Sequence, residues 1–457
     1  MKRLITYILF FFSWGLPFSG NAQSVTKKAP TPLISNRLAT DYYEFVNKVM
    51  QTIGIQPTEL SRVFGYMGLT LYESLVPGMP ACNSLVGQLN GLNKLPQPDP
   101  EQSYCWEMVA NAAMKSIIED LVKSHALGRD EYLNYQLYNP VKKIYQEHDS
   151  LLKLSYKKTD IQKRSIAYGD TLAKFIFSFS KADGGYRSTF EELQADYSHY
   201  QSPPNATWHD SLTKAGISLQ PTWGKNRTFI KFIDGIAQAA PPYPISTDTT
   251  SIYYKQAKEV YELYRKQTFE QRVIAEYWKD NPSSTFTPPG HSMSILTQLL
   301  QEQNSSLEFT AIAYAKMGFA LSDAFVCCWK TKYETNCVRP INYIRKYIDV
   351  RFVPSITTPP FPEYTSGHSV QAGAASEVLT NLFGNNFAFT DKTLDRFQIS
   401  AAKRYLVNRS FPNFYAMAEE SSMSRVYGGI HYRQACEVGV AQGRIIGQEI
   451  NNLKWKK

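Results

Sequence analysis

Apolar residues recur at three- and four-residue spacing along most of the chain, which is the period of an amphipathic α-helix. This pattern predicts helices at 36–53, 59–75, 104–122, 161–179, 251–278, 292–301 and 307–332. A further apolar run, from Val370 to Leu379, predicts a helix directly after a Ser-Gly-His tripeptide. We find no sequence repeat and no strand-rich region. The sequence therefore predicts an all-α fold, in the form of a large helical bundle.

The helical period fails between residues 184 and 244, where prolines, glycines and aromatic residues dominate. A long irregular stretch inside a compact domain is more often a functional loop or a surface belt than a linker. The length of 457 residues alone leaves the number of domains open. We expect one all-α domain over residues 23–457 with long decorating loops.

Residues 1–22 have the three zones of a secretory signal peptide. Lys2 and Arg3 form the charged start, residues 4–14 the apolar centre, and Gly20-Asn21-Ala22 a small-residue cleavage site. The apolar run is shorter than the ~20 residues that a membrane-spanning helix needs, which disfavours a membrane anchor. We expect an exported protein, periplasmic or extracellular, in which no later segment spans a membrane.

Charge and cysteine content narrow the picture further. The net charge is +9, but no basic block alternates with aromatic residues, so we expect no nucleic-acid partner. Export would permit disulfides among the six cysteines, and Cys82 with Cys105 is the first pair that we expect. The other pairings and the oligomeric state stay open.

Three segments of the sequence, 329–340, 361–368 and 424–431, supply the groups that a tetrahedral oxyanion needs. Their cations are Lys332, Arg339 and Arg425. Their hydroxyl, backbone donor and histidines are Ser366, Gly367, His368 and His431. Guanidinium groups match two oxygens at once, and the N–H groups at a helix N-terminus favour an anion. Each residue taken singly has an ordinary structural explanation, such as a helix cap or a buried histidine, but the set predicts an oxyanion site.

Local sequence rules place these groups at helix ends. Pro340 disfavours the α conformation at Arg339, so we expect Lys332 near the end of one helix and Arg339 at the entry to the next. Arg425 and His431 would lie on different faces of a continuous helix. The Gly-Gly dipeptide between them can break the helix and turn both side chains toward one point.

The order of these motifs resembles that of the vanadium-dependent haloperoxidases and the related type 2 phosphatidic acid phosphatases. The matching motifs are Lys-x6-Arg-Pro, Ser-Gly-His and Ser-Arg-x5-His, and they cover about a fifth of the chain, between Lys332 and His431. The sequence looks closest to the secreted bacterial haloperoxidase-like group. Trp329 and the run 359–362 sit where haloperoxidases carry residues that line the pocket.

The resemblance implies vanadate as the cofactor, with hydrogen peroxide and a halide, iodide or bromide, as substrates. His431 would coordinate vanadium, and His368 would exchange protons with a bound oxygen. The vanadate oxygens would be held by Lys332, Arg339, Ser366, Gly367 and Arg425. Trp329 and Phe361 would narrow and dry the pocket, which suits a small halide better than a bulky phosphoester.

The same set of residues also fits an exported acid phosphatase. In that reaction phosphate esters would be the substrates, His431 would become phosphohistidine, and His368 would protonate the leaving alcohol. A non-catalytic oxyanion-binding protein is a third class. The two spaced histidines argue against it, because binding alone requires only the cations.

The sequence departs from the family pattern at two positions. Thr365 replaces the proline that usually precedes Ser-Gly-His, and Ala435 replaces an aspartate that is common four residues after the final histidine. We therefore expect the acceptor that orients His431 to be Glu437 or a backbone carbonyl.

Other residues are candidates for the surroundings of the site. Asp280 and Asp323 are candidate carboxylate partners of His368. Residues 277–278 and 287–291 are candidates for the wall of the site.

Overall fold

The computed structural model describes residues 36–125, 137–186, 219–281, 287–397 and 405–457. The predicted signal peptide, residues 1–22, lies outside the described residues, as does part of the predicted irregular stretch. The described part of that stretch, from residue 219 onward, contains only the short helices η4 (Trp223–Lys225) and α8 (Ile233–Ile236) before residue 244.

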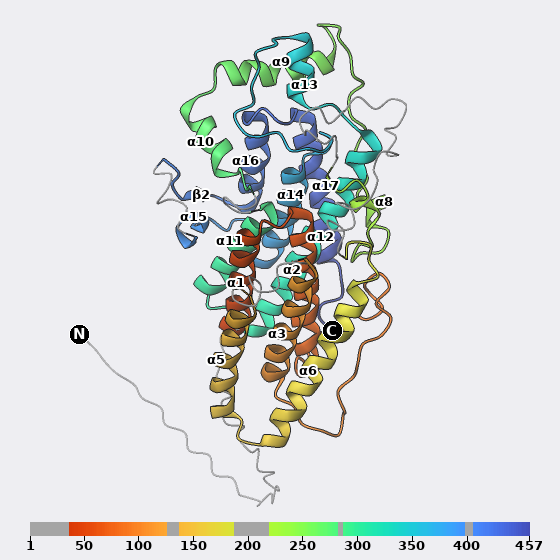
Figure 1. Ribbon diagram of the computed structural model, residues 1–457, viewed down its shortest axis with the longest axis vertical. Coiled ribbons are helices and arrows are strands. Elements are labelled where there is room, and N and C mark those ends of the chain that lie inside the picture. Colours follow the sequence, from red (N-terminus) through yellow and green to blue (C-terminus); the bar gives the residue numbers. More distant parts are fainter. Residues whose placement is uncertain (1–35, 126–136, 187–218, 282–286, 398–404) are drawn as a thin grey trace, which may run out of the picture. The chain divides into compact units, whose positions relative to one another are not determined.

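The all-α prediction is confirmed (Figure 1). The N-terminal helices are α1 (Arg37–Ile53), α2 (Pro57–Leu75), η1 (Val76–Gly78), α3 (Trp106–His125), α5 (Asn139–Ser155) and α6 (Thr159–Ser180). The later helices are α9 (Ile252–Arg265), α10 (Phe269–Tyr277), α11 (Pro288–Glu302), α12 (Leu307–Thr335), α13 (Pro340–Tyr347), α14 (Gly367–Phe383), α15 (Thr393–Arg396), α16 (Phe414–Tyr427) and α17 (Arg433–Asn451). Two short strands, β1 (Phe389–Asp391) and β2 (Arg409–Phe411), pair antiparallel.

The prediction of one continuous helix at 251–278 is wrong, because the structure has two helices there, α9 and α10, separated by a short non-helical segment. Thr268 caps α10: its hydroxyl accepts a hydrogen bond from the backbone N–H of Gln271, and the Gln271 side chain accepts one from the backbone N–H of Thr268. This capping box is a helix-start signal that apolar spacing alone overlooks. Helices α5, α16 and α17 were not among the predicted set.

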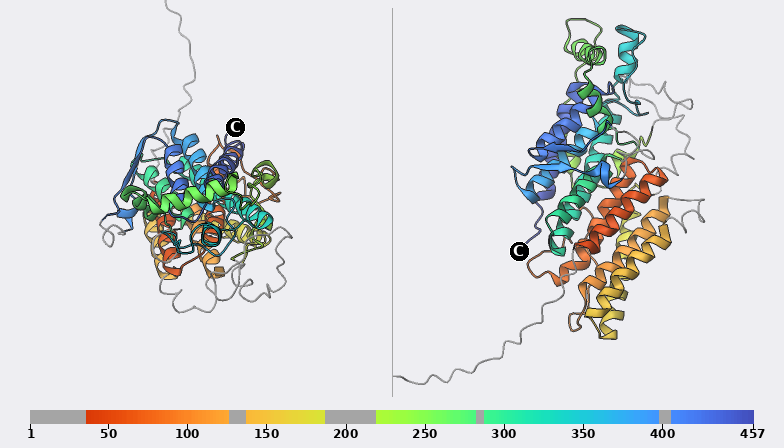
Figure 2. Two further views of the ribbon diagram at one scale, coloured as in Figure 1. Left: turned by 90° about the horizontal axis from the view of Figure 1, so that it is seen from above. Right: turned by 90° about the vertical axis from the view of Figure 1, so that its left-hand side faces the viewer.

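Helix α12 lies at the centre of the bundle. It packs against α2 on one side and against α14 and α17 on the other, so it joins the N-terminal helices to those that carry the later motifs (Figure 2). The stretch Leu307–Tyr347 is long and apolar enough to cross a membrane, contrary to the expectation that no such segment follows residue 22. Its apolar window is completely buried inside the protein, as expected for a core helix.

The expected disulfide between Cys82 and Cys105 is absent, and all six cysteines are free. The Cys82 thiol contacts the Glu308 carboxylate, whereas the Cys105 thiol contacts Glu107. Burial raises the pKa of the Cys105 thiol to about 12, which keeps it protonated and unreactive at neutral pH.

Candidate functional site

The three motif segments meet at the ends of four helices. Lys332 lies in the last turn of α12, and Arg339 is the N-cap residue of α13, with Pro340 in its first turn. Ser366 caps α14 by accepting a hydrogen bond from the backbone N–H of Ser369. The expected helix entry at Arg339 is therefore present: Arg339 is extended before Pro340, and the preceding helix has already ended at Thr335.

The predicted break between the last two motif residues is also present. Arg425 lies in the last turn of α16, which ends at Tyr427, and Gly429 adopts a left-handed φ of 77°. The chain turns there before α17 begins at Arg433, and His431 lies in this turn. The glycine conformation lets the side chains of Arg425 and His431 reach the same cavity.

That cavity has a volume of about 310 Å³. The predicted site residues in its wall are Trp329, Phe361, Gly367, His368, Arg425 and His431. The rings of Trp329 and Phe361 pack with their centroids 4.9 Å apart. An added Cβ on Gly367 would lie 3.6 Å from the Trp329 ring, an ordinary contact distance, so glycine leaves a space of about one methyl group beside the backbone.

The geometry of His431 fixes its tautomer. Its Nδ1 lies 2.8 Å from Glu363 Oε1, and its Nε2 lies 2.9 Å from Arg339 Nη1. The guanidinium only donates, so Nε2 is the acceptor and Nδ1–H donates to the carboxylate. Burial, and then Arg339, Lys332 and Arg425, lower the pKa of His431 well below its usual value. His431 is therefore a neutral imidazole with a lone pair on Nε2.

Glu363 is the acceptor that orients this histidine, and the expectation of Glu437 or a backbone carbonyl is wrong. Glu363 Oε1 also accepts from the backbone N–H of Tyr432 at 3.0 Å. Glu437 instead faces Arg433, at 3.8 Å. Burial raises the pKa of Glu363 to about 7, although Arg339 and Lys332 oppose the shift.

Arg339 is buried and has one free end. Its Nε donates to Phe361 O at 2.9 Å, and its Nη1 donates to Ile430 O and to His431 Nε2, both at 2.9 Å. Its Nη2 is buried without a hydrogen-bond partner. A buried guanidinium nitrogen without an acceptor is costly, so this atom indicates a place for an oxyanion.

Lys332 is buried beside the cavity, but its three donors go to the backbone. Its Nζ donates to the carbonyls of Pro362, Glu363 and Thr365 at 2.9, 3.0 and 2.6 Å. Burial lowers the pKa of Lys332 to about 8. In this arrangement Lys332 holds the loop that leads into Ser366 and adds positive charge, whereas Arg339 keeps an unpartnered Nη2 and Arg425 lines the cavity.

Arg425 completes the cationic side of the cavity. Its Nε donates to Ser424 Oγ at 3.0 Å and its Nη2 to Ala275 O at 3.2 Å. Burial lowers the pKa of Arg425 to about 10, and the charge of Asp280 opposes that shift. The guanidinium stays charged at neutral pH.

His368 lies in the first turn of α14 and faces the cavity, with 16% of its side chain exposed. Its Nε2 is 3.6 Å from Asp280 Oδ2, which identifies Asp280 as the partner. Asp323, the other candidate, instead accepts from the backbone N–H groups of Phe229 and Ile230. Burial and then Arg425 lower the pKa of His368 to about 4, and Asp280 acts in the opposite direction.

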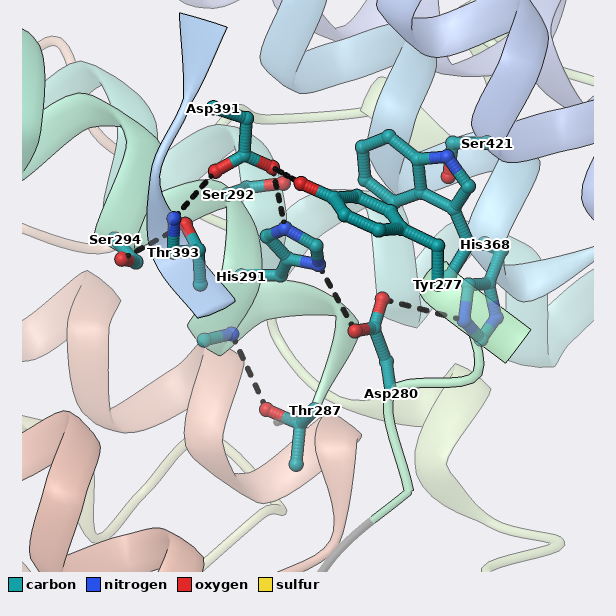
Figure 3. Close-up of polar contacts among 12 residues, drawn as sticks. Tyr277, Asp280, Thr287, His291, Ser292, Ser294, His368, Asp391, Thr393 and Ser421 are labelled. Carbon is teal, nitrogen blue, oxygen red and sulfur yellow. Dashed lines mark hydrogen bonds and ion pairs between the residues drawn. The ribbon is translucent and has the colours of Figure 1, made fainter. Parts of the chain in front are cut away.

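Of the two predicted wall segments, 287–291 contributes Pro288 to the cavity wall. Residues 277–278 are not among the lining residues, and the residues that follow them, Lys279 and Asp280, line the cavity instead. His291 lies one layer farther out, where it contacts Asp280 and Asp391 (Figure 3). Sequence reasoning did not single out Asp391, since nothing in the local sequence links it to a residue 100 positions away.

Solved structures with this architecture are similar over nearly the whole chain. A crystal structure described as the first bacterial vanadium-dependent iodoperoxidase is 31% identical, with a TM-score of 0.78 over 93% of this chain and 98% of that one. A holo-type bacterial vanadium-dependent chloroperoxidase is 15% identical, with a TM-score of 0.62 over 89% of this chain and 95% of that one. Residues 346–455 match the family model "VCPO second helical-bundle domain". No curated protein sequence matches the chain.

Proposed function

Because this chain belongs to the vanadium-dependent haloperoxidase family, we propose that it oxidises iodide or bromide with hydrogen peroxide when vanadate is bound. The observation that carries this proposal is the state of His431, whose Nδ1–H is held by Glu363 and whose Nε2 lone pair is directed into the donor set. The name of the iodoperoxidase supports iodide as a substrate. The chloroperoxidases, at 15% and 14% identity, support the fold alone.

The residues around the cavity fit a tetrahedral oxyanion such as vanadate. Three buried cations, Lys332, Arg339 and Arg425, face two carboxylates, Glu363 and Asp280, so the site has an excess of positive charge. An anion would offset that excess, and buried charges require such compensation. The unpartnered Nη2 of Arg339 and the space beside Gly367 would receive its oxygens.

Each residue then has a distinct role. His431 would hold vanadium through Nε2, and Arg339, Arg425, Ser366 and the Gly367 N–H would hold the oxygens. Lys332 would contribute charge and keep the 362–365 backbone in place. Histidine is a suitable ligand only when one ring nitrogen is unprotonated, which the low pKa of His431 ensures.

The chemistry divides between the cofactor and the protein. Bound vanadate supplies a Lewis-acidic centre at which hydrogen peroxide becomes able to oxidise a halide. His368 lines the cavity and is neutral at neutral pH, so its imidazole ring can accept a proton from incoming peroxide. Arg339 and Arg425 stabilise developing negative charge with preorganised donors. Trp329 and Phe361 keep the wall apolar and limit the size of what enters.

The direct test compares the vanadate-free protein with and without added orthovanadate. We expect peroxide-dependent oxidation of iodide and bromide only after loading, and we expect inorganic phosphate to inactivate the loaded enzyme slowly by competing for the same donors. Hydrolysis of a phosphoester is measured on the same samples. Phosphoester hydrolysis without halide oxidation would instead support the phosphatase, and neither activity together with no bound vanadium would overturn the site.

Export rests on residues 1–22 alone, with their charged, apolar and small-residue zones. We propose that the mature protein begins near Gln23 and is found outside the cytoplasm. N-terminal sequencing of protein from the periplasmic and culture fractions tests this. An intact first methionine on protein confined to the cytosol would contradict it.

A further inference from the structure

A chain of buried polar side chains extends from His368 away from the cavity (Figure 3). His368 Nε2 lies 3.6 Å from Asp280 Oδ2, and Asp280 Oδ1 lies 2.9 Å from His291 Nδ1. His291 Nε2 lies 2.7 Å from Asp391 Oδ2, which also accepts from the Tyr277 hydroxyl at 2.8 Å. These residues belong to the end of α10, the loop after it, α11, β1 and α14. This network of polar contacts therefore links five separate segments of the polypeptide to one side of the site.

His291 is held as a cation. Each ring nitrogen faces a carboxylate, and a carboxylate can only accept, so both nitrogens carry a proton. The ring also stacks on Trp278, with centroids 4.7 Å apart, which favours a cation over an aromatic face. Burial opposes the charge, but Asp280 and Asp391 outweigh burial and raise the pKa of His291 to about 10.

At the end farthest from His368, this network of polar contacts ends at buried groups. Besides Tyr277, Asp391 accepts from the backbone N–H of Thr393 at 2.9 Å, and Thr393 Oγ1 donates to Ser294 Oγ at 3.0 Å. Tyr277, Thr393 and Ser294 are all buried. A relay that delivered protons to solvent would need to end at an exposed group or at water. This arrangement is suited to fixing geometry and charge rather than to transporting protons.

Asp280 links this network to His368, and its orientation depends on its contact with His291. It is buried, and its backbone has a left-handed φ of 46°, which is uncommon outside glycine. Its Oδ1 is taken by His291, whereas its Oδ2 has no hydrogen bond and points toward His368 Nε2. His291 thus determines which oxygen of Asp280 faces the catalytic histidine.

We propose that His291 and Asp391 are positioning residues that hold Asp280 with Oδ2 toward His368, and so orient the His368 ring for proton exchange with peroxide. This inference rests on the proposed haloperoxidase function. His291 also keeps the pair of aspartates from presenting two uncompensated negative charges beside an anion site. Loss of His291 would free Asp280 to rotate and would weaken the field that favours vanadate.

The competing explanation is a purely structural cross-link between α11 and β1. Both explanations predict some loss of thermal stability when His291 is replaced, so stability does not separate them. The matched control is His148→Gln, because His148 is also buried and its Nε2 lies 3.2 Å from a carboxylate, Asp41, but it is not part of the cavity wall. A readout at His368 separates the two explanations.

The first measurement needs neither vanadate nor halide. The full chain has seven histidines, few enough for side-chain signals in ¹⁵N-histidine spectra to be assigned by single substitutions. We expect both ring nitrogens of His291 to be protonated at pH 8 in the wild-type protein. We also expect His291→Gln, but not His148→Gln, to shift or broaden the His368 ring signals. A neutral His291 in the wild type, or unchanged His368 signals in the variant, would overturn the inference.

The second measurement uses the vanadate-loaded enzyme. We expect His291→Gln to lower kcat for iodide oxidation by about 10–100-fold, with KM for iodide little changed, and to weaken orthovanadate binding. Asp391→Asn keeps the shape of the side chain and should lower kcat and orthovanadate binding by a smaller factor. It replaces His291→Gln in this test if that variant does not fold. Wild-type kcat in either folded variant would reject the positioning role.

The two measurements distinguish a failure of the proposed function from a failure of the positioning role. If the wild-type chain binds no orthovanadate while the His291 and His368 spectra behave as expected, the proposed function is wrong and the positioning of His368 stands. If vanadate loading and halide oxidation are found but His291→Gln leaves kcat and the His368 signals unchanged, only the positioning role is wrong.

Discussion

Substitution of alanine for His431 is expected to abolish vanadate retention and, with it, halide oxidation. His431 offers a neutral imidazole nitrogen, Nε2, at 2.9 Å from Arg339 Nη1. The other proposed contacts are hydrogen bonds to oxygens, which do not replace a direct bond to the metal. Loss of an outer partner of a ligand commonly weakens binding 10–100-fold, so loss of the ligand itself should exceed about 100-fold. Elemental analysis of vanadium after desalting, with circular dichroism for folding, measures the effect.

Glu363→Gln is expected to weaken vanadate binding less than His431→Ala does. The amide can still accept from His431 Nδ1–H through its oxygen, but it no longer carries the charge that makes Nε2 a better donor to a metal. We expect vanadate affinity to fall about 10–100-fold in this variant, between wild type and His431→Ala. Full vanadium content in His431→Ala would show that Nε2 does not hold the cofactor.

Much of the local geometry of the site follows from residue types that act on their own neighbours. Pro340 keeps Arg339 extended at the start of α13, Ser366 caps the helix that carries His368, and a glycine pair turns the chain before His431. Each rule involves residues only a few positions apart, so it can be applied without knowledge of the fold. The clustering of these side chains does not follow from such rules; it was predicted from the set of groups that an oxyanion needs and from the order of motifs shared with the family.

Partners that are distant in sequence could not be predicted in this way. Glu363 lies within the 361–368 segment, yet its hydrogen bond to His431 joins residues 68 positions apart. The choice of Asp280 over Asp323 depends on which carboxylate the bundle turns toward α14, and Asp323 is instead used by the backbone at Phe229 and Ile230. Spacing carries no information about such contacts.

The helices, too, could be predicted only in part from the local sequence. The apolar spacing of α2 and α12 was sufficient to predict them, since both are core helices with strong patterns. The break between α9 and α10 depended on the Thr268 and Gln271 capping box, which apolar spacing does not detect. The two aromatic residues proposed for the pocket, Trp329 and Phe361, came from the family resemblance, and the structure places both in the cavity wall.

The second large effect is expected at His368. His368→Ala should retain vanadate, with affinity changed less than about tenfold, but lose about 10²–10⁴ in kcat for iodide oxidation. The physical reason is that the His368 ring lines the cavity while its Nε2 points toward Asp280 without a hydrogen bond, so the ring holds no part of the cationic cage. Its lowered pKa, about 4, leaves it as a neutral base at working pH. Steady-state kinetics on protein with measured vanadium content separates turnover from loading.

The control for this prediction is His148→Ala, which removes another buried imidazole beside a carboxylate, Asp41, on a helix that does not line the cavity. We expect that variant to keep wild-type kcat and vanadium content, whatever its thermal stability. Near-full turnover in His368→Ala would show that peroxide loses its proton to another group. Loss of vanadium from His368→Ala, at levels like those of His431→Ala, would instead mean that both histidines bind the cofactor and that the division of roles between them is wrong.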